Sequence, residues 1–224
     1  MAGRLAEFYD IIVDSAWFKD PVANPYDYSN LMEALPYWFN GIVPLAYELD
    51  DDRLKAQANS AADKILDKQA EDGWIGPETE GTRNFWGRMP LFLGLANLAD
   101  VNADYTDRIV DSLKRFFRLT NTMLKNDGEG YTNCSEGYDC TWGQVRVGEM
   151  LVTMQWLLEK HPSEDDDLIW ETMEMFHDMN TLKWEDWYTD AYPHTVPNPD
   201  PGNLKLWPFI HGVNVGQGTL SFFL

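Results

Sequence analysis

Apolar residues recur along this chain every three to four positions, which is the period of an α-helix and not of a β-strand. The sequence contains no alternating run of apolar and polar residues long enough to predict a sheet. The predicted helices lie within residues 5–16, 37–49, 53–69, 89–99, 105–124, 144–160 and 166–179, and a further short one begins near Trp184. We therefore predict an all-α protein.

Segments rich in glycine, proline and acidic residues separate the predicted helices. These helix-breaking segments are residues 72–81, 125–140, 161–165 and 193–203. Connections of this kind favour antiparallel helix pairs, with the unusual side chains in the loops between them.

The chain is strongly acidic, with 37 Asp and Glu against 17 Lys and Arg and a net charge of −20. Phosphate-binding faces need clustered Lys and Arg, so we expect neither nucleic acid nor an anionic membrane as a partner. No stretch is long and apolar enough to span a bilayer. Residues 1–14 lack the apolar core of a secretory signal peptide, so the sequence assigns no compartment.

Two cysteines, Cys134 and Cys140, lie in a polar loop that contains glycine. They could close a small disulfide or remain free thiols. No further Cys or His is placed to complete a zinc site with them, so we predict no metal site here. The same loop holds Asn133-Cys134-Ser135, which has the form of an N-glycosylation acceptor. Both features favour an oxidising, secreted setting.

Three regions combine aromatic, carboxylate and Arg or Asn side chains. A site for a polyhydroxylated ligand needs this set, because aromatic rings stack on sugar rings and polar groups pair with hydroxyls that would otherwise be buried unpaired. The candidate substrate-binding residues are Glu33, Trp38 and Asn40 in the first region, Trp74, Trp86 and Arg88 in the second, and Trp142, Arg146 and Glu149 in the third.

Structural roles are open for the same residues. The tryptophans fit core packing as well as a sugar platform. Arg146 and Glu149 lie three positions apart on a predicted helix and can pair with each other. A catalytic carboxylate pair can always be found among 37 acidic residues, so the sequence alone names none.

Three segments, in this order along the chain, carry a resemblance to a known family. They are "PYWFNGIVPLAYELDD" (36–51), "ILDKQAEDGWIGPE" (65–78) and "FIHGVNVGQG" (209–218). Together they resemble glycoside hydrolase family 127, over roughly residues 4–218. The resemblance implies an (α/α)6 toroid with a sugar bound at one mouth of the ring, and an oligosaccharide or polysaccharide substrate.

Characterised members of that family are retaining β-L-arabinofuranosidases. The resemblance implies a cysteine nucleophile in a zinc site and a glutamate acid/base, but the zinc motif follows the "HGVNV" segment and this chain ends before it. Cys134 and Cys140 lie upstream and do not match it, and Arg88 stands where the family favours a histidine. Only His211 matches a family histidine that lines the sugar site. No nucleophile, acid/base or zinc ligand is therefore assigned.

The C-terminal "TLSFFL" does not resemble what the family places after Gly218. We expect residues 1–218 to form a partial toroid and residues 219–224 to be a tail outside the family pattern. A closed toroid needs twelve helices, so an incomplete ring is expected to leave apolar flanks open to self-association. The predicted function is a carbohydrate-active hydrolase domain that ends before its catalytic motif. The alternative is an inactive helical fragment that binds sugar or another protein.

Overall fold

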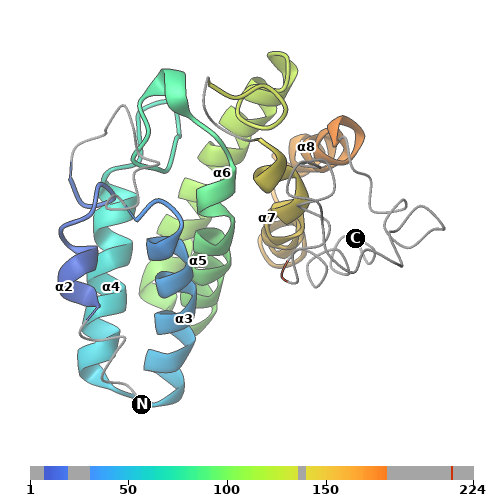
Figure 1. Ribbon diagram of the computed structural model, residues 1–224. Coiled ribbons are helices and arrows are strands. Elements are labelled where there is room, and N and C mark those ends of the chain that lie inside the picture. Colours follow the sequence, from blue (N-terminus) through green and yellow to red (C-terminus); the bar gives the residue numbers. More distant parts are fainter. Residues whose placement is uncertain (1–7, 20–30, 136–139, 181–212, 214–224) are drawn as a thin grey trace, which may run out of the picture.

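The computed structural model describes residues 8–19, 31–135, 140–180 and 213, and they build a helical array (Figure 1). The α-helices are α2 (Tyr9–Ile12), α3 (Ala34–Glu48), α4 (Asp52–Asp67), α5 (Met89–Val101), α6 (Ala103–Lys125), α7 (Thr141–Lys160) and α8 (Asp166–Met179). Two 3₁₀ turns, η2 (Glu80–Thr82) and η3 (Trp86–Arg88), lie between α4 and α5. Within the described ranges there is no β-strand, only an isolated bridge between Glu129 and Asn133. The all-α prediction is confirmed for this part of the chain.

Most predicted helices match the observed ones to within a few residues at each end. The exception is the helix predicted over 5–16, whose described part is helical only from Tyr9 to Ile12. The segment near Trp184 lies outside the described residues.

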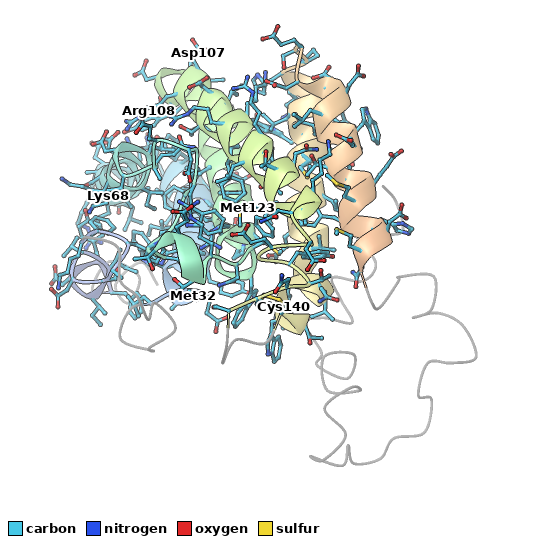
Figure 2. The ribbon with its side chains drawn as sticks, turned by 90° about the horizontal axis from the view of Figure 1, so that it is seen from above. Met32, Lys68, Asp107, Arg108, Met123 and Cys140 are labelled. Atoms are coloured by element: carbon cyan, nitrogen blue, oxygen red, sulfur yellow. A yellow bond between two sulfur atoms is a disulfide. The ribbon has the colours of Figure 1, made fainter. Side chains whose placement is uncertain are left out.

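Three consecutive hairpins, α3–α4, α5–α6 and α7–α8, form two layers. In one layer α3 packs on α5 and α5 packs on α7. In the other, α6 packs on α8, and α6 is joined to α4 by polar contacts. Arg108 of α6, which Figure 2 labels, pairs for example with Asp63 of α4 at 2.9 Å. Each hairpin thus lies beside its neighbours in sequence order.

The layer that contains α5 is more apolar in sequence and more deeply buried than the layer of α4 and α6. Helix α5 is apolar over most of its circumference, and its half-buried or exposed residues lie on one stripe of Leu93, Asn97, Asp100 and Val101. Helices α4 and α6 are amphipathic, with Asp, Lys and Arg on the side away from the core. A helix that is apolar over most of its circumference must be covered over most of it, so α5 becomes the centre of its layer.

Gly94 sets the close approach of α3 and α5. An added Cβ there would lie 2.7 Å from the Phe39 ring and 3.1 Å from backbone atoms of Asn40. The absence of a side chain at this position lets the two helices approach closely enough to seat Phe39 and Ile42, both fully buried.

Exposed large apolar residues are spread over several elements. Within the described ranges they include Ile11 on α2, Tyr37 on α3, Val101 on α5 and Trp170 on α8. They are not gathered on one terminal hairpin, and self-association stays a prediction. In the part of the chain that the structure describes, no helix has both the length and the apolar content to cross a bilayer.

Candidate functional site

A hydrogen bond between two side chains joins α3 to α7 across the layer. Nη1 of Arg146, on α7, donates to the Tyr37 hydroxyl on α3. Arg146 is 5% exposed, whereas Tyr37 is 39% exposed. The Arg146 guanidinium is therefore buried beneath the Tyr37 phenol, which is the part of the pair that solvent can reach.

Two glutamates flank the guanidinium. Glu33 precedes the first turn of α3, and Glu149 lies on α7, buried like Arg146. Burial raises the pKa of Glu33 above its usual value, and the attraction of Arg146 offsets part of that rise. Burial likewise raises the pKa of Glu149 to about 7, again partly offset by Arg146. Near neutral pH the Glu149 carboxyl therefore exists in both protonation states and can donate or accept a hydrogen bond.

The Tyr37 hydroxyl responds to the same three groups. Burial raises its pKa, Arg146 opposes the rise, and the negative charges of Glu149 and Glu33 add to it. The four groups are therefore electrostatically coupled. We call Glu33, Tyr37, Arg146 and Glu149 the α3–α7 polar cluster.

Two tryptophans adjoin the cluster. Trp86 of η3 and Trp142 of α7 stack with ring centroids 5.7 Å apart and an interplanar angle of 22°. The Arg146 guanidinium carbon lies 5.8 Å from the centroid of the Trp142 ring. Both tryptophans are half-buried, so aromatic surface lies next to the cluster.

Helical spacing explains why these side chains converge. Trp142, Arg146 and Glu149 stand at positions i, i+4 and i+7 of α7, which share one helix face. Glu33, Tyr37 and Asn40 have the same spacing along α3, and Asn40 is half-buried. The two polar stripes belong to helices of one layer, and the Arg146–Tyr37 bond joins them.

Three of the sequence-predicted residues lie elsewhere. Trp38 is 5% exposed and packs against Tyr9, with ring centroids 5.9 Å apart. Trp74 is 1% exposed, and Arg88 is 0% exposed with its guanidinium carbon 4.2 Å from the Trp74 ring centroid. Their burial gives them core roles, because a side chain that is cut off from solvent offers no surface to a ligand.

Arg88 belongs to a buried polar group under the loop that follows α4. Its Nε donates to the Ile75 carbonyl at 2.8 Å, and its Nη2 donates to Glu78. The Trp74 indole also donates to Glu78, at 3.1 Å. A carboxylate that accepts from both a guanidinium and an indole fixes the loop to the core.

Sequence reasoning missed Tyr37. It lies four residues after Glu33, but the predicted helix begins only at residue 37, so the face that the two residues share is not apparent from the sequence. Only the folded loop shows that Glu78 is the partner of Arg88. His211 lies outside the described residues.

The cysteines are joined in a disulfide, with Cα atoms 5.9 Å apart. Of the two possibilities that the sequence left open, the structure therefore has the bonded one. The bonded sulfurs of Cys134 and Cys140 do not fit the thiolate ligands of a zinc site. In the described ranges, no group of three or more His, Cys, Asp or Glu is placed to hold a metal ion.

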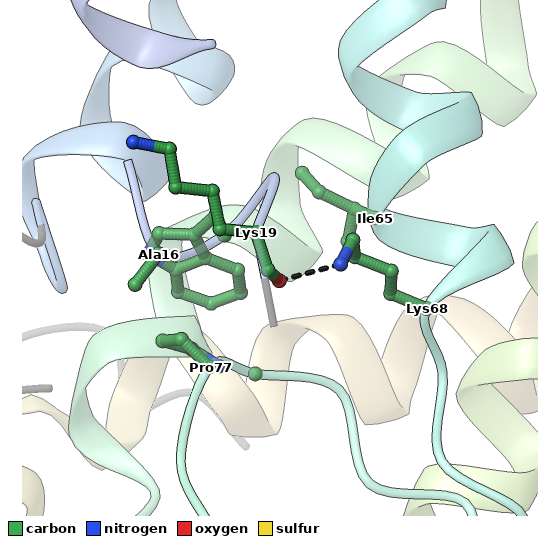
Figure 3. Close-up of a pocket in the computed structure, with 7 residues that line it drawn as sticks. Ala16, Lys19, Ile65, Lys68 and Pro77 are labelled. Atoms are coloured by element: carbon green, nitrogen blue, oxygen red, sulfur yellow. Dashed lines mark hydrogen bonds between the residues drawn. The ribbon is translucent and has the colours of Figure 1, made fainter. Parts of the chain in front are cut away.

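A separate pocket of about 230 Å³ opens between α4 and the segment after α2 (Figure 3). The Lys68 ammonium crosses it to donate to the Lys19 carbonyl at 2.5 Å. Its lining is Ala16, Trp17, Lys19, Ile65, Lys68, Gly76 and Pro77. It contains none of the sequence-predicted site residues and no carboxylate, so the α3–α7 polar cluster is the better candidate site.

Comparisons with known proteins give no further identification. No protein-family model, curated protein or solved structure matches the chain.

Proposed function

We propose that the α3–α7 polar cluster is a glycan-binding site, and that the chain is part of a carbohydrate-active hydrolase domain like those of glycoside hydrolase family 127. The single observation that carries this proposal is the Arg146–Tyr37 bond, flanked by two glutamates of raised pKa and bordered by the Trp142 ring. Sugars are recognised by such a set, in which aromatic surface meets hydrogen-bonding groups of both kinds.

Each group has a distinct part in the proposed binding. The half-exposed Trp142 and Trp86 rings supply apolar surface to one face of a sugar ring. Tyr37 and the half-buried Glu33 are the accessible polar groups, and they pair with hydroxyls. The buried Arg146 donates a hydrogen bond to the Tyr37 oxygen and so orients the Tyr37 hydroxyl.

Glu149 is the described residue whose pKa best fits a general acid, but its side chain is only 7% exposed, so it can reach a glycosidic oxygen only if the cluster opens to solvent. A general acid works best when its pKa lies near the working pH, and burial brings that of Glu149 to about 7. Protonation of the leaving oxygen is the first requirement of glycosidic cleavage. A nucleophile is not assigned among the described residues.

The arrangement of the hairpins supports a toroid as the complete fold. In an (α/α)6 ring alternate helices form an inner and an outer layer, and the α3–α5–α7 contacts follow this order. The three described hairpins would then be consecutive hairpins of such a ring.

Calorimetric titration of the full chain with arabinose-, rhamnose- and glucuronate-containing oligosaccharides tests the binding proposal. We expect Arg146→Met and Tyr37→Phe to weaken binding, the first by tenfold or more. Tyr105→Phe is the matched control, because Tyr105 bonds to Asp63 between α4 and α6, away from the cluster. Binding that Arg146→Met leaves unchanged would place the sugar elsewhere.

Hydrolysis is assayed separately by chromatography of released sugar. Turnover that Glu149→Gln abolishes supports the hydrolase proposal. Binding without turnover supports the alternative of an inactive sugar-binding chain, and the absence of any binding leaves a protein-interaction role.

A further inference from the structure

Asn133 lies on the surface of the loop between α6 and α7, and its backbone is held in place. Its N–H donates to the Gly128 carbonyl at 3.1 Å, and its own carbonyl accepts from the Gly130 N–H at 2.8 Å. The side chain is exposed, and its amide makes a long bond of 3.4 Å to the Asp127 carboxylate. Two residues earlier, Tyr131 is fully buried and donates to the Phe176 carbonyl. The loop is thus anchored at Tyr131 and presents Asn133 to solvent.

The acceptor sequence for N-glycosylation occurs once in the chain, at Asn133-Cys134-Ser135. The middle residue is not proline, and Ser135 supplies the hydroxyl. Most surface asparagines lack this context, as Asn126 of the same loop does, because Asp127 and Gly128 follow it.

The same tripeptide carries one half of the disulfide. Cys134, its middle residue, is bonded to Cys140, where α7 begins (Figure 2). Disulfides persist in the oxidising compartments of the secretory route, and N-linked glycans are attached on that route. The exposed acceptor asparagine and the bonded cysteine next to it therefore both indicate the secretory route, the first through glycan attachment and the second through disulfide formation.

We propose that Asn133 is a site of N-linked glycosylation. The donor is a lipid-linked oligosaccharide diphosphate. The Asn133 Nδ2 forms a bond to C1 of the first sugar, the bond from C1 to the phosphate oxygen breaks, and the lipid diphosphate leaves with the electron pair. One amide proton is lost. The product carries its glycan on the outside of the α6–α7 loop.

Mass spectrometry of the full chain, expressed behind a secretory leader in yeast, tests the proposal. We expect the wild-type chain to carry one glycan, which an amidase that cleaves N-glycans removes with conversion of Asn133 to Asp. Asn133→Gln and Ser135→Ala should each abolish the modification, while Ser135→Thr and the loop control Asn126→Gln should retain it.

Whole-cell extract is analysed together with secreted protein. The glycan is attached before folding is complete, so a variant that folds poorly and stays in the cell still shows whether residue 133 was modified. A wild-type peptide containing residue 133 that is found only unmodified in both fractions overturns the proposal. So does a glycan that persists in Asn133→Gln. Neither result bears on the α3–α7 polar cluster.

Discussion

The Arg88 guanidinium donates to the Glu78 carboxylate at a place where neither side chain exposes any surface to solvent. A buried pair of this kind is costly to break, because the remaining partner keeps an uncompensated charge away from water. We therefore expect Arg88→Met to lower the free energy of unfolding by about 3–5 kcal/mol.

Urea unfolding measures that loss. Arg108→Met is the control, because its pair with Asp63 is exposed to solvent and such pairs contribute about 1 kcal/mol or less. Equal effects of the two substitutions would show that burial does not decide the strength of the Arg88–Glu78 pair.

Glu149 should make the protein less stable as the pH rises. Its pKa is raised from 4.5 to about 7 in the folded chain, so the folded state holds a proton that the unfolded state releases. The stabilisation is fully present below the unfolded pKa and is lost as the pH rises through 7. It amounts to at most about 3 kcal/mol. Denaturant unfolding at both ends of this pH window should show a smaller decrease for Glu149→Gln than for the wild type, and identical decreases would contradict the shift.

Gly94 and Gly41 should respond in opposite directions to alanine. At Gly94 the new methyl meets the Phe39 ring and the backbone of α3, so we expect a loss of about 1–3 kcal/mol from overpacking. At Gly41, in the middle of α3, nothing lies within 4 Å, and the better helix propensity of alanine should stabilise by up to about 1 kcal/mol. Thermal unfolding of both variants measures whether each substitution stabilises or destabilises the protein. A stabilised Gly94→Ala would mean that α3 and α5 do not approach as described.

Trp142→Ala should weaken glycan binding about tenfold, which corresponds to about 1.4 kcal/mol of lost ring contact. Trp170→Ala on α8 is the matched control, since Trp170 is 51% exposed and lies on a helix outside the cluster. Calorimetry with the oligosaccharide that binds the wild type tightest provides the measurement. A comparable loss in both variants would indicate a general effect of removing tryptophan.

Neutral oligosaccharides should bind more tightly than glucuronate-containing ones of the same length. One guanidinium faces two glutamates in the cluster, and the whole chain carries a net charge of −20, so a further carboxylate is repelled at neutral pH. Titration with matched ligands at low salt is the test, and a preference for the glucuronate ligand would contradict this electrostatic picture.

The site residues divide according to whether local spacing or long-range folding decides them. Arg146 and Glu149 share a helix face, and that relation is readable from their positions three apart. The partner of Arg146 cannot be read from the sequence, because Tyr37 lies 109 residues away and meets Arg146 only when α3 and α7 are placed in one layer. The three tryptophans at 38, 74 and 86 are alike in the sequence, and only the packing separates the buried Trp38 and Trp74 from the half-buried Trp86.

The helices from α3 to α8 could be read from the sequence, because apolar periodicity and the breakers between segments act over a few residues. The sequence also placed Asn133, Cys134 and Cys140 in one loop. Three other features became visible only in the folded chain: the disulfide between the cysteines, the pairing of Arg88 with Glu78 inside the core, and the two glutamates beside Arg146. Burial and charge pairing depend on which helix faces meet, and those meetings are set by contacts between segments far apart in the chain.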